Sequence, residues 1–338
     1  MASVAVVILN YNGVGYLEQF LPSVVQHSSD AEIIIADNAS TDHSIEFLEK
    51  NYPGLRVIQL EKNLGYAGGY NLALKDINYD YSILLNSDIE VTPNWIHPII
   101  NYMEAHAGVV ACQPKILDYQ NKEKFEYAGA AGGFIDYMGY PYCRGRILDE
   151  LEIDHGQYDE ISDIHWATGA CMFVRTSSFK DAGGFDDDFF AHMEEIDLCW
   201  RFRLMGHSLK CIPESKIYHV GGGTLNKLNP RKTYLNFRNN LSLLLKNETA
   251  SRLVWQLPFK VLLDWAAACK FALDNSWSHS WAILRAQMAF VILISKNLKK
   301  RALISRNKKI NLQNSNFLLP FQYFIKGKKT FDQIHQHP

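Results

Sequence analysis

The sequence has no Cys-x-x-Cys pair, although it contains six cysteines along its 338 residues. Scattered cysteines argue against a disulfide framework and against a structural zinc site, and they are typical of a reducing compartment. The first residues also lack the charged start and the cleavage site of a signal peptide. We therefore expect a protein that is not exported.

An excess of charge of either sign is also absent. The formal net charge is −2, which gives no reason to expect nucleic acid as a partner. Nearly half of the residues are apolar and about a fifth are charged, an ordinary balance for a globular protein. The length suffices for one large domain or two medium ones.

Two nucleotide-binding signatures are missing. Gly65, Gly68 and Gly69 do not make the Gly-x-Gly-x-x-Gly fingerprint of dinucleotide enzymes. Residues 10–15 hold no Lys or Arg, whereas a sugar nucleotidyltransferase needs a basic, glycine-rich triphosphate loop near this position. A sugar nucleotidyltransferase is therefore kept only as an alternative. A second alternative is a non-catalytic scaffold that binds a sugar nucleotide or a polysaccharide.

Short apolar runs alternate with helix-like stretches in the first half of the chain. The runs cover 4–9, 32–36, 55–60 and 81–85, and the helical stretches cover 16–27, 42–51 and 69–77. This alternation predicts an α/β fold with a mostly parallel sheet covered on both faces. Three of the runs end in small polar or acidic residues, and ligands bind beyond such strand ends.

The pattern changes from about residue 108. Glycines and aromatic residues between 129 and 145 predict hairpins or a loop over the site. A strand pair is expected over 161–174, a helix over 193–204 and an extended segment over 210–219.

Five motifs occur in a family-specific order: VILNYNG (7–13), ADNASTD (36–42), NLGYAGG (63–69), LLNSD (84–88) and FFAHMEEIDLCWR (189–201). Over residues 3–245 the chain resembles the family 2 glycosyltransferases, and more narrowly their rhamnosyltransferase-like group. The resemblance implies a GT-A fold for a catalytic domain over residues 1–245. It also implies a nucleotide-sugar donor, either dTDP-rhamnose or a UDP-hexose, and sugar transfer with inversion.

The same resemblance places the donor on strand ends and loops. The residues expected to bind it are Asn10, Tyr11, Asn12, Asp37, Asn38, Asn63, Gly65, Gly69, Asn71, Asn86, Ser87, Trp166, Thr168 and Gly169. Asp37 can accept the imide hydrogen of uracil or thymine, or it can be an ordinary turn former. Trp166 can stack on a pyranose or pack in the core.

Asp88 and His219 are the expected metal ligands, with Mg²⁺ or Mn²⁺ as the cofactor. Asn86 departs from the family's Asp-x-Asp pattern and removes one charge. A metal bound to a diphosphate needs oxygen ligands, and imidazole suits Mn²⁺ better than Mg²⁺. Asp88 as a turn residue and His219 as a buried hydrogen-bonding residue are the alternatives.

The catalytic candidates are Glu195, Glu194 and Asp197. Inverting transfer needs a carboxylate that takes the proton of the acceptor hydroxyl, and Glu195 stands where the family has aspartate. On a helix, Glu195 heads an apolar stripe with Leu198, while Asp197 can pair with Arg201. Stabilisation of acids by the helix dipole is the competing explanation.

The remaining segment, residues 246–338, is predicted to be a helical extension, apolar and then basic. Apolar stretches cover 252–273 and 281–294, four tryptophans lie between 255 and 281, and seven basic residues follow between 296 and 309. A helical cap, a membrane-surface anchor and a homodimer interface are all compatible with it. The basic cluster favours the anchor, which predicts a cytoplasmic protein peripheral to the inner face of the cell membrane, acting on a glycan or lipid-linked acceptor.

Overall fold

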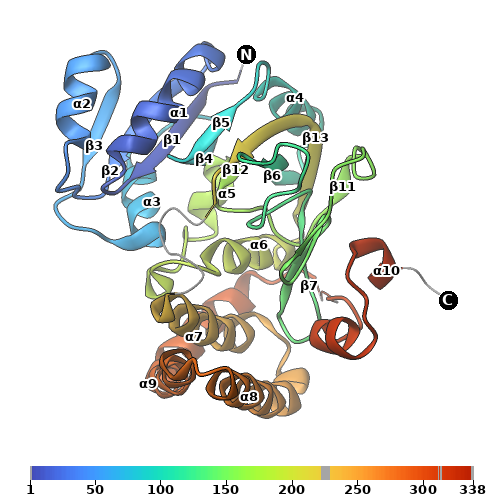
Figure 1. Cartoon of the computed structure of the whole chain (residues 1–338). Coiled ribbons are helices and arrows are strands. Elements are labelled where there is room, and N and C mark those ends of the chain that lie inside the picture. Colours follow the sequence, from blue (N-terminus) through green and yellow to red (C-terminus); the bar gives the residue numbers. More distant parts are fainter. Residues whose placement is uncertain (1, 222–228, 311, 313, 336–338) are drawn as a thin grey trace.

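The computed structural model describes residues 2–221, 229–310, 312 and 314–335, and a large sheet lies at its centre (Figure 1). The strand order is β3-β2-β1-β4-β12-β6-β13-β11, with β5 paired to β13 beside this path. The bounds are β1 (Val4–Asn10), β2 (Glu32–Asp37), β3 (Arg56–Gln59), β4 (Tyr81–Asn86), β5 (Ile89–Val91), β6 (Val109–Asp118), β11 (Ser162–Asp163), β12 (Cys171–Arg175) and β13 (Ser208–His219). Strands β3, β2, β1 and β4 are parallel, and β12 runs antiparallel to β4 and β6.

Helices cover both faces of this sheet, as the apolar strands predict. Along β1, Val4, Val6 and Ile8 pack into one core, whereas Ala5 and Val7 pack into the other, because successive strand residues point to opposite faces. The first core is shared with α1 (Val14–His27), α2 (Ser44–Asn51) and α4 (His97–Ala105). The second is shared with α3 (Gly65–Lys75), α5 (Thr176–Asp181) and α6 (Glu194–Leu204).

The predicted helix over 69–77 begins earlier than expected. α3 starts at Gly65, whose φ of 71° lies in the left-handed region that glycine tolerates best. The glycines of the NLGYAGG motif therefore form the first turns of a helix in addition to the loop before it.

The glycine-rich segment forms hairpins, as predicted. Its small antiparallel sheet consists of β7 (Gly133–Ile135), β8 (Pro141–Cys143), β9 (Arg146–Ile147) and β10 (Glu150–Leu151). The end of the chain, with η2 (Phe321–Ile325) and α10 (Phe331–His335), returns to this sheet, where Tyr142, Ile147, Leu319 and Ile334 form a separate small core.

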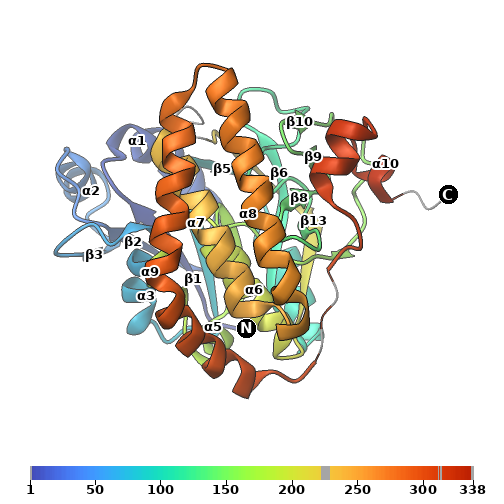
Figure 2. The same cartoon turned by 90° about the horizontal axis from the view of Figure 1, so that it is seen from below.

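Three long helices follow: α7 (Pro230–Asn247), α8 (Ala250–Leu273) and α9 (Trp277–Asn307). The helices α8 and α9 lie in the predicted helical extension over 246–338, whereas α7 lies almost entirely before residue 246. Figures 1 and 2 show α7 next to α6, with α8 and α9 side by side on its outer side. Leu241 and Leu244 of α7 and Phe290 of α9 belong to the same core as the residues of α6. The helices thus pack on the same core as α6.

Candidate active site

The polar strand ends meet at one edge of the sheet. Pairing of β1 with β2 places Asn10 opposite Asp37, and pairing of β1 with β4 places Leu9 opposite Asn86. The carboxyl ends of parallel strands form the ligand-binding edge of α/β sheets. Sequence order alone predicted this convergence, because the strands had to be parallel.

Asp37 is buried and held by its neighbours. Its Oδ1 accepts hydrogen bonds from Asn10 Nδ2 (3.0 Å) and Ser40 Oγ (2.6 Å), and its Oδ2 accepts one from Ser40 N (2.9 Å). A carboxylate oxygen has two lone pairs, so Oδ2 keeps capacity for one further donor. Asn10 Oδ1 is buried and has no hydrogen-bond partner among the described residues, which leaves an acceptor for a ligand at the same place.

The loop after β1 is held by contacts with the rest of the protein, although part of it is exposed. Asn12 has a φ of 50°, and its Oδ1 accepts a hydrogen bond from Thr41 N (2.7 Å). Tyr11 is 45% exposed beside it. A side chain on Gly13 would collide with Asn10 Oδ1. This loop therefore presents an exposed aromatic ring on a fixed backbone.

Asn38 joins the second strand end to the NLGYAGG loop. Its Nδ2 donates to Asn63 Oδ1 (3.1 Å) and to Gly65 O (3.0 Å), while its Oδ1 accepts from Leu64 N (2.9 Å). Gly69 lies against Leu9, where a Cβ would have no room. The two predicted donor-binding loops are thus one connected surface.

Asp88 and His219 lie together, as predicted, because β5 pairs with β13. That pairing sets Ile89 opposite His219, and Asp88 Oδ1 lies 3.1 Å from His219 Nε2. On the other side, His219 Nδ1 lies 3.3 Å from Glu126 Oε1. Sequence reasoning missed Glu126, since it stands outside every motif. Asn86 Nδ2 lies 3.5 Å from His219 Nε2, and Ser87 is close to Gly13.

Asp88, His219 and Glu126 are all buried, and the pKa values of His219 and Asp88 are shifted because these groups lie so close together. Burial alone would lower the pKa of His219, but the carboxylates of Asp88 and Glu126 raise it well above its usual value. Burial opposes ionisation of Asp88 too, and His219 nevertheless lowers its pKa. Two carboxylates around one imidazole leave a net negative site.

The donor set fits a divalent cation in part. Within the described ranges, no group of three or more His, Cys, Asp or Glu side chains has the geometry to hold a metal ion. Asp88 can supply an oxygen ligand, and His219 can supply a nitrogen ligand once its imidazole has lost a proton, so phosphate oxygens and water have to complete the coordination. Such a site would hold a metal together with a diphosphate.

Glu194 and Glu195 stand at the start of α6. We call residues 186–201 the catalytic segment, because they include the predicted catalytic residues. Oε2 of Glu194 and Oε2 of Glu195 are both buried without a hydrogen-bond partner among the described residues. Burial raises the pKa of Glu195 to about 7. Burial and the nearby Glu195 raise the pKa of Glu194 well above its usual value. Burial thus favours the protonated form of both glutamates, and Glu195 changes charge in the neutral range where a general base operates.

Asp197 is bound by cationic and amide groups of the protein. Its side chain is fully buried, and it pairs with Arg201 (2.9 Å), as predicted, and with Lys246 of α7 (2.8 Å). Asn247 Nδ2 donates a third contact (2.7 Å). Burial opposes ionisation, yet Lys246 and Arg201 keep the pKa of Asp197 lowered. Asp197 therefore anchors α6 to α7, and its oxygens are not directed at a reacting group.

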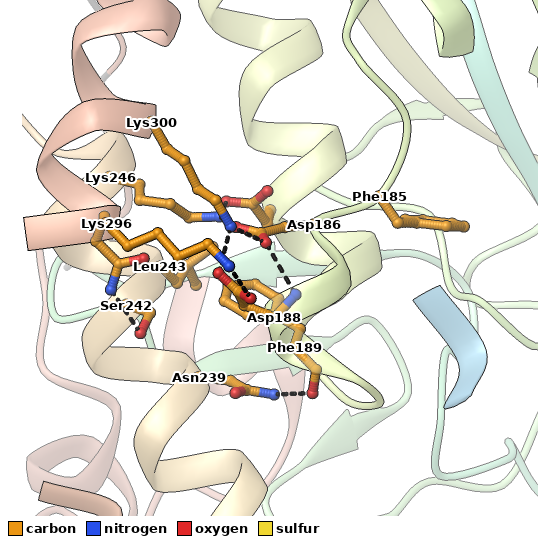
Figure 3. Close-up of polar contacts among 12 residues, drawn as sticks. Phe185, Asp186, Asp188, Phe189, Asn239, Ser242, Leu243, Lys246, Lys296 and Lys300 are labelled. Atoms are coloured by element: carbon orange, nitrogen blue, oxygen red, sulfur yellow. Dashed lines mark hydrogen bonds and ion pairs between the residues drawn. The ribbon is translucent and has the colours of Figure 1, made fainter. Parts of the chain in front are cut away.

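The segment before α6 is strained and is held by the C-terminal helices (Figure 3). Phe190, His192 and Met193 have φ values of 64°, 68° and 73°, each unfavourable by about 1–3 kcal/mol. Asn239 Nδ2 of α7 lies within 3.1 Å of three carbonyl oxygens of this segment, those of Phe189, Ala191 and His192.

Just upstream, η1 (Asp187–Phe189) and Asp186 meet three lysines. Lys246 and Lys300 bind Asp186, and Lys296 (2.6 Å) and Lys300 (2.6 Å) bind Asp188. Figure 3 shows these side chains reaching inward from α7 and α9. Part of the basic cluster thus serves the catalytic segment, a role that sequence spacing did not reveal.

This same segment contacts the donor loop. Phe190 O accepts hydrogen bonds from Tyr66 N (2.7 Å) and Ala67 N (3.2 Å), the first turn of α3. Gly65 lies so close to Phe190 that a Cβ would collide with it. The start of α3 and the start of α6 are thereby fixed to each other, which connects the donor loop with Glu195.

Several predicted donor residues make internal contacts instead. Asn71 bonds with Phe185 and Asp187. Trp166 is 3% exposed and donates from Nε1 to Phe134 O (2.8 Å), in agreement with the core-packing alternative. Thr168 is also buried, and Gly169 O accepts from Tyr66 Oη (2.6 Å). These residues support the floor of the site.

The comparisons with known proteins agree with this geometry. The family model described as "Glycosyl transferase family 2" matches residues 5–181. The chain is 25% identical over 231 residues to the N-acetylglucosaminyl-diphospho-decaprenol L-rhamnosyltransferase of Mycobacterium tuberculosis, covering 63% of this chain and 75% of that protein. It is 23% identical over 223 residues to the rhamnosyltransferase WbbL of Escherichia coli, covering 64% and 83%.

Solved structures show the same fold. TarS 1–349 of S. aureus superimposes with a TM-score of 0.55 at 15% identity, covering 90% of this chain and 86% of that one. GalNAc-T7 with UDP, GalNAc and Mn²⁺ superimposes with a TM-score of 0.58 at 17% identity, covering 73% of this chain. The present chain spans about half (48%) of that longer one. The fold is therefore GT-A, and the chain belongs to glycosyl transferase family 2.

Proposed function

We propose that this glycosyltransferase moves a sugar from dTDP-rhamnose or a UDP-hexose to a hydroxyl of a glycan or lipid-linked acceptor, with inversion, in cell-surface polysaccharide synthesis. The observation that carries the proposal is that Asp37 and the Asp88–His219 pair follow polar strand ends, while Glu195 at the start of α6 is joined to the NLGYAGG loop through Phe190. The rhamnosyltransferase names of the relatives support the donor class.

Each part of the donor has a counterpart in the site. The free acceptor capacity of Asp37 and Asn10 suits the imide of a pyrimidine base. The exposed ring of Tyr11 suits the flat face of that base. The diphosphate would then lie toward Asp88 and His219.

A divalent metal, Mg²⁺ or Mn²⁺, would be held by Asp88 and His219 and would neutralise the leaving diphosphate. Mn²⁺ is present in the GalNAc-T7 structure and in that of a Pyrobaculum calidifontis mannosyltransferase with GDP-Man, which superimposes with a TM-score of 0.51. Both observations support the use of a divalent ion.

Glu195 acts as the base. Its carboxylate takes the proton of the acceptor hydroxyl while the hydroxyl oxygen forms a bond to the anomeric carbon. The bond from that carbon to the phosphate oxygen breaks at the same time, and the nucleotide diphosphate leaves with the electron pair. Attack opposite the leaving group inverts the anomeric centre.

The reaction takes place at the inner face of the cell membrane, where lipid-linked acceptors are presented. The decaprenol in the name of the mycobacterial relative supports such an acceptor. The exposed tryptophans of α8 and α9 support the location.

Calorimetric titration with dTDP- and UDP-sugars, with and without Mn²⁺ or Mg²⁺, tests the proposal. We expect one donor to bind selectively and more tightly with metal. Asp88→Asn should weaken that metal-dependent binding at least tenfold, whereas Asp118→Asn, at another strand end, should not. Absence of binding by the folded protein would favour a scaffold, and formation of a nucleotide sugar from a nucleoside triphosphate would favour a nucleotidyltransferase.

A further inference from the structure

The α8–α9 hairpin lies on the outside of the molecule (Figure 2), and its exposed side chains form an apolar surface. We call it the outer face and define it by Leu262, Trp265, Leu273, Trp277, Trp281 and Ile292. Their side chains are 51–84% exposed. Contiguous exposed apolar surface of this kind marks an interaction site in a soluble protein. Trp265 Nε1 donates to Gln287 Oε1 (2.7 Å), so the faces of the two helices are continuous.

Two of the charges that interrupt the apolar stretch of α8 are buried on its inner side, whereas Lys270 is exposed near the end of the helix. Lys260 and Asp264 are almost completely buried and form an ion pair with each other, one helical turn apart. Lys260 also lies over the Tyr140 ring. A helix of a soluble protein has the reverse arrangement, with charged residues outside and apolar residues inside. Exposed positions of α8 are consequently uncharged from Val254 to Cys269.

The surroundings of the outer face are positively charged. Residues 250–309 contain eleven Lys and Arg but only two Asp and Glu, although the whole chain has a net charge of −2. Lys296, Lys300 and Arg301 are used within the molecule. Lys299 and Arg306 are exposed beyond the apolar part of α9, where they are free to meet anionic headgroups.

α9 is the one helix of the described residues that is long and apolar enough to cross a membrane, judged by length and composition. Its inner side nevertheless packs against the rest of the protein. Ile283 and Phe290 are buried in the packing, and Asn297 Nδ2 donates to Ser242 Oγ of α7 (3.0 Å). A helix fixed along one side in this way can lie on a bilayer, with only its outer side in contact with lipid.

We propose that the outer face is the lipid-binding surface of the protein and lies flat on an anionic bilayer, with the tryptophans at the headgroup level. The inference rests on the proposed function in one respect, since a lipid-linked acceptor explains why the enzyme is there. Anionic lipid is favoured over a second copy of the chain, because a second copy would bring its own basic hairpin against this one.

Vesicle co-sedimentation of the full chain tests the proposal. We expect binding to phosphatidylglycerol–phosphatidylcholine vesicles and much less to phosphatidylcholine alone. Trp281→Gln with Ile292→Gln should reduce partition about tenfold or more. Lys299→Gln with Arg306→Gln should reduce it about fivefold for each charge. The matched controls are Ile153→Gln with Ile161→Gln and Lys50→Gln with Lys75→Gln, which should bind as the unchanged chain does.

Size-exclusion chromatography and donor titration of the same variants separate the outcomes. Retained donor binding with lost vesicle binding supports the proposal, whether or not the donor assignment holds. Vesicle binding that the outer-face variants leave unchanged would overturn it. So would a dimer in solution that these variants break, without vesicle binding, because a second copy would then cover the outer face.

Discussion

Among the three acids of the catalytic segment, position in the structure decides the role of each. Asp197 is neutralised by Lys246 and Arg201, and Glu194 keeps its proton. Glu195 alone combines an unbonded buried oxygen with a pKa of about 7. Glu195 is therefore the residue that we propose as the base.

Glu195→Gln should lower kcat by about 10²–10⁴, the usual contribution of a general base, with donor affinity nearly unchanged. Glu194→Gln is the matched control, and it should have a much smaller effect because Gln resembles the protonated acid already present. The measurement is steady-state transfer of the sugar by both variants. Equal losses in the two would contradict the assignment of the base.

The pKa of Glu195 also predicts a pH profile. kcat/KM should rise as pH increases through about 7, where Glu195 loses its proton. In Glu195→Gln this rise of kcat/KM with pH should be absent.

Stability should change in the opposite direction. The folded chain holds the Glu195 proton more tightly than the unfolded chain, so the free energy of unfolding falls as pH rises between 4.5 and about 7. Glu195→Gln should therefore melt at a higher temperature than the unchanged chain in mildly alkaline buffer, and nearly equally in acidic buffer. A thermal melt at both pH values measures this, and equal melting points in alkaline buffer would contradict the raised pKa.

The sequence predicts which residues line the site only where those residues belong to a motif. Asp88 and His219 were brought together by the expected strand ends, but Glu126 has no motif and could not be found. Trp166 was ambiguous, because stacking on a sugar and packing in a core need the same residue. Burial, which sequence does not report, separates the two.

Among the elements, α7 determines the shape of the catalytic segment. Asn239 contacts three carbonyl oxygens of the strained turn before α6, and Lys246 joins Asp186 to Asp197. Sequence patterns located α6 within one residue, at Glu194 in place of 193. They gave no sign of these contacts of α7, because the residues in contact are about fifty positions apart in the chain.

Asn239→Ala should reduce kcat more than it raises the KM for donor, because the turn can relax and displace Glu195. Asn240→Ala is the control, since Asn240 is equally buried but donates to Gly139 O (2.7 Å). Both variants should lose about 1–3 kcal/mol of stability. Similar kcat values in the two would contradict a specific role for Asn239.

Lys246→Met tests the buried ion cluster. Removing this ammonium takes one of two cationic partners from each of Asp186 and Asp197, at an expected loss of about 3 kcal/mol. Chemical denaturation measures the loss, and Lys296→Met, at an exposed pair, should lose about 1 kcal/mol or less. A loss for Lys246→Met no larger than that for Lys296→Met would show that the cluster is not stabilising.

In the whole molecule, the apolar runs predicted the sheet and its two helical layers, since parallel strands need apolar residues on both faces. The C-terminal region was predicted as helical, but its relation to the rest was open among three alternatives. Lysines that suggested lipid contact proved to bind Asp186 and Asp188 in part. Long-range ion pairs of this kind leave no periodic signal in a sequence.

Because α8 and α9 share the core of α6, a chain ending at Glu248 should not be an independent catalytic domain. Leu253 and Phe290 would leave that core, and Lys296 and Lys300 would leave the catalytic segment. We expect this truncation to lose its cooperative thermal transition or to aggregate. A soluble truncation that melts cooperatively near the temperature of the full chain would contradict this view.

The most direct test of the central claim is the product itself. The purified chain should be incubated with dTDP-rhamnose or a UDP-hexose, a lipid-linked glycan acceptor and Mn²⁺, and the new linkage examined by NMR. We expect a glycoside whose anomeric configuration is opposite to that of the donor, formed by the unchanged chain and not by Glu195→Gln. Retained configuration, or equal turnover by Glu195→Gln, would contradict it.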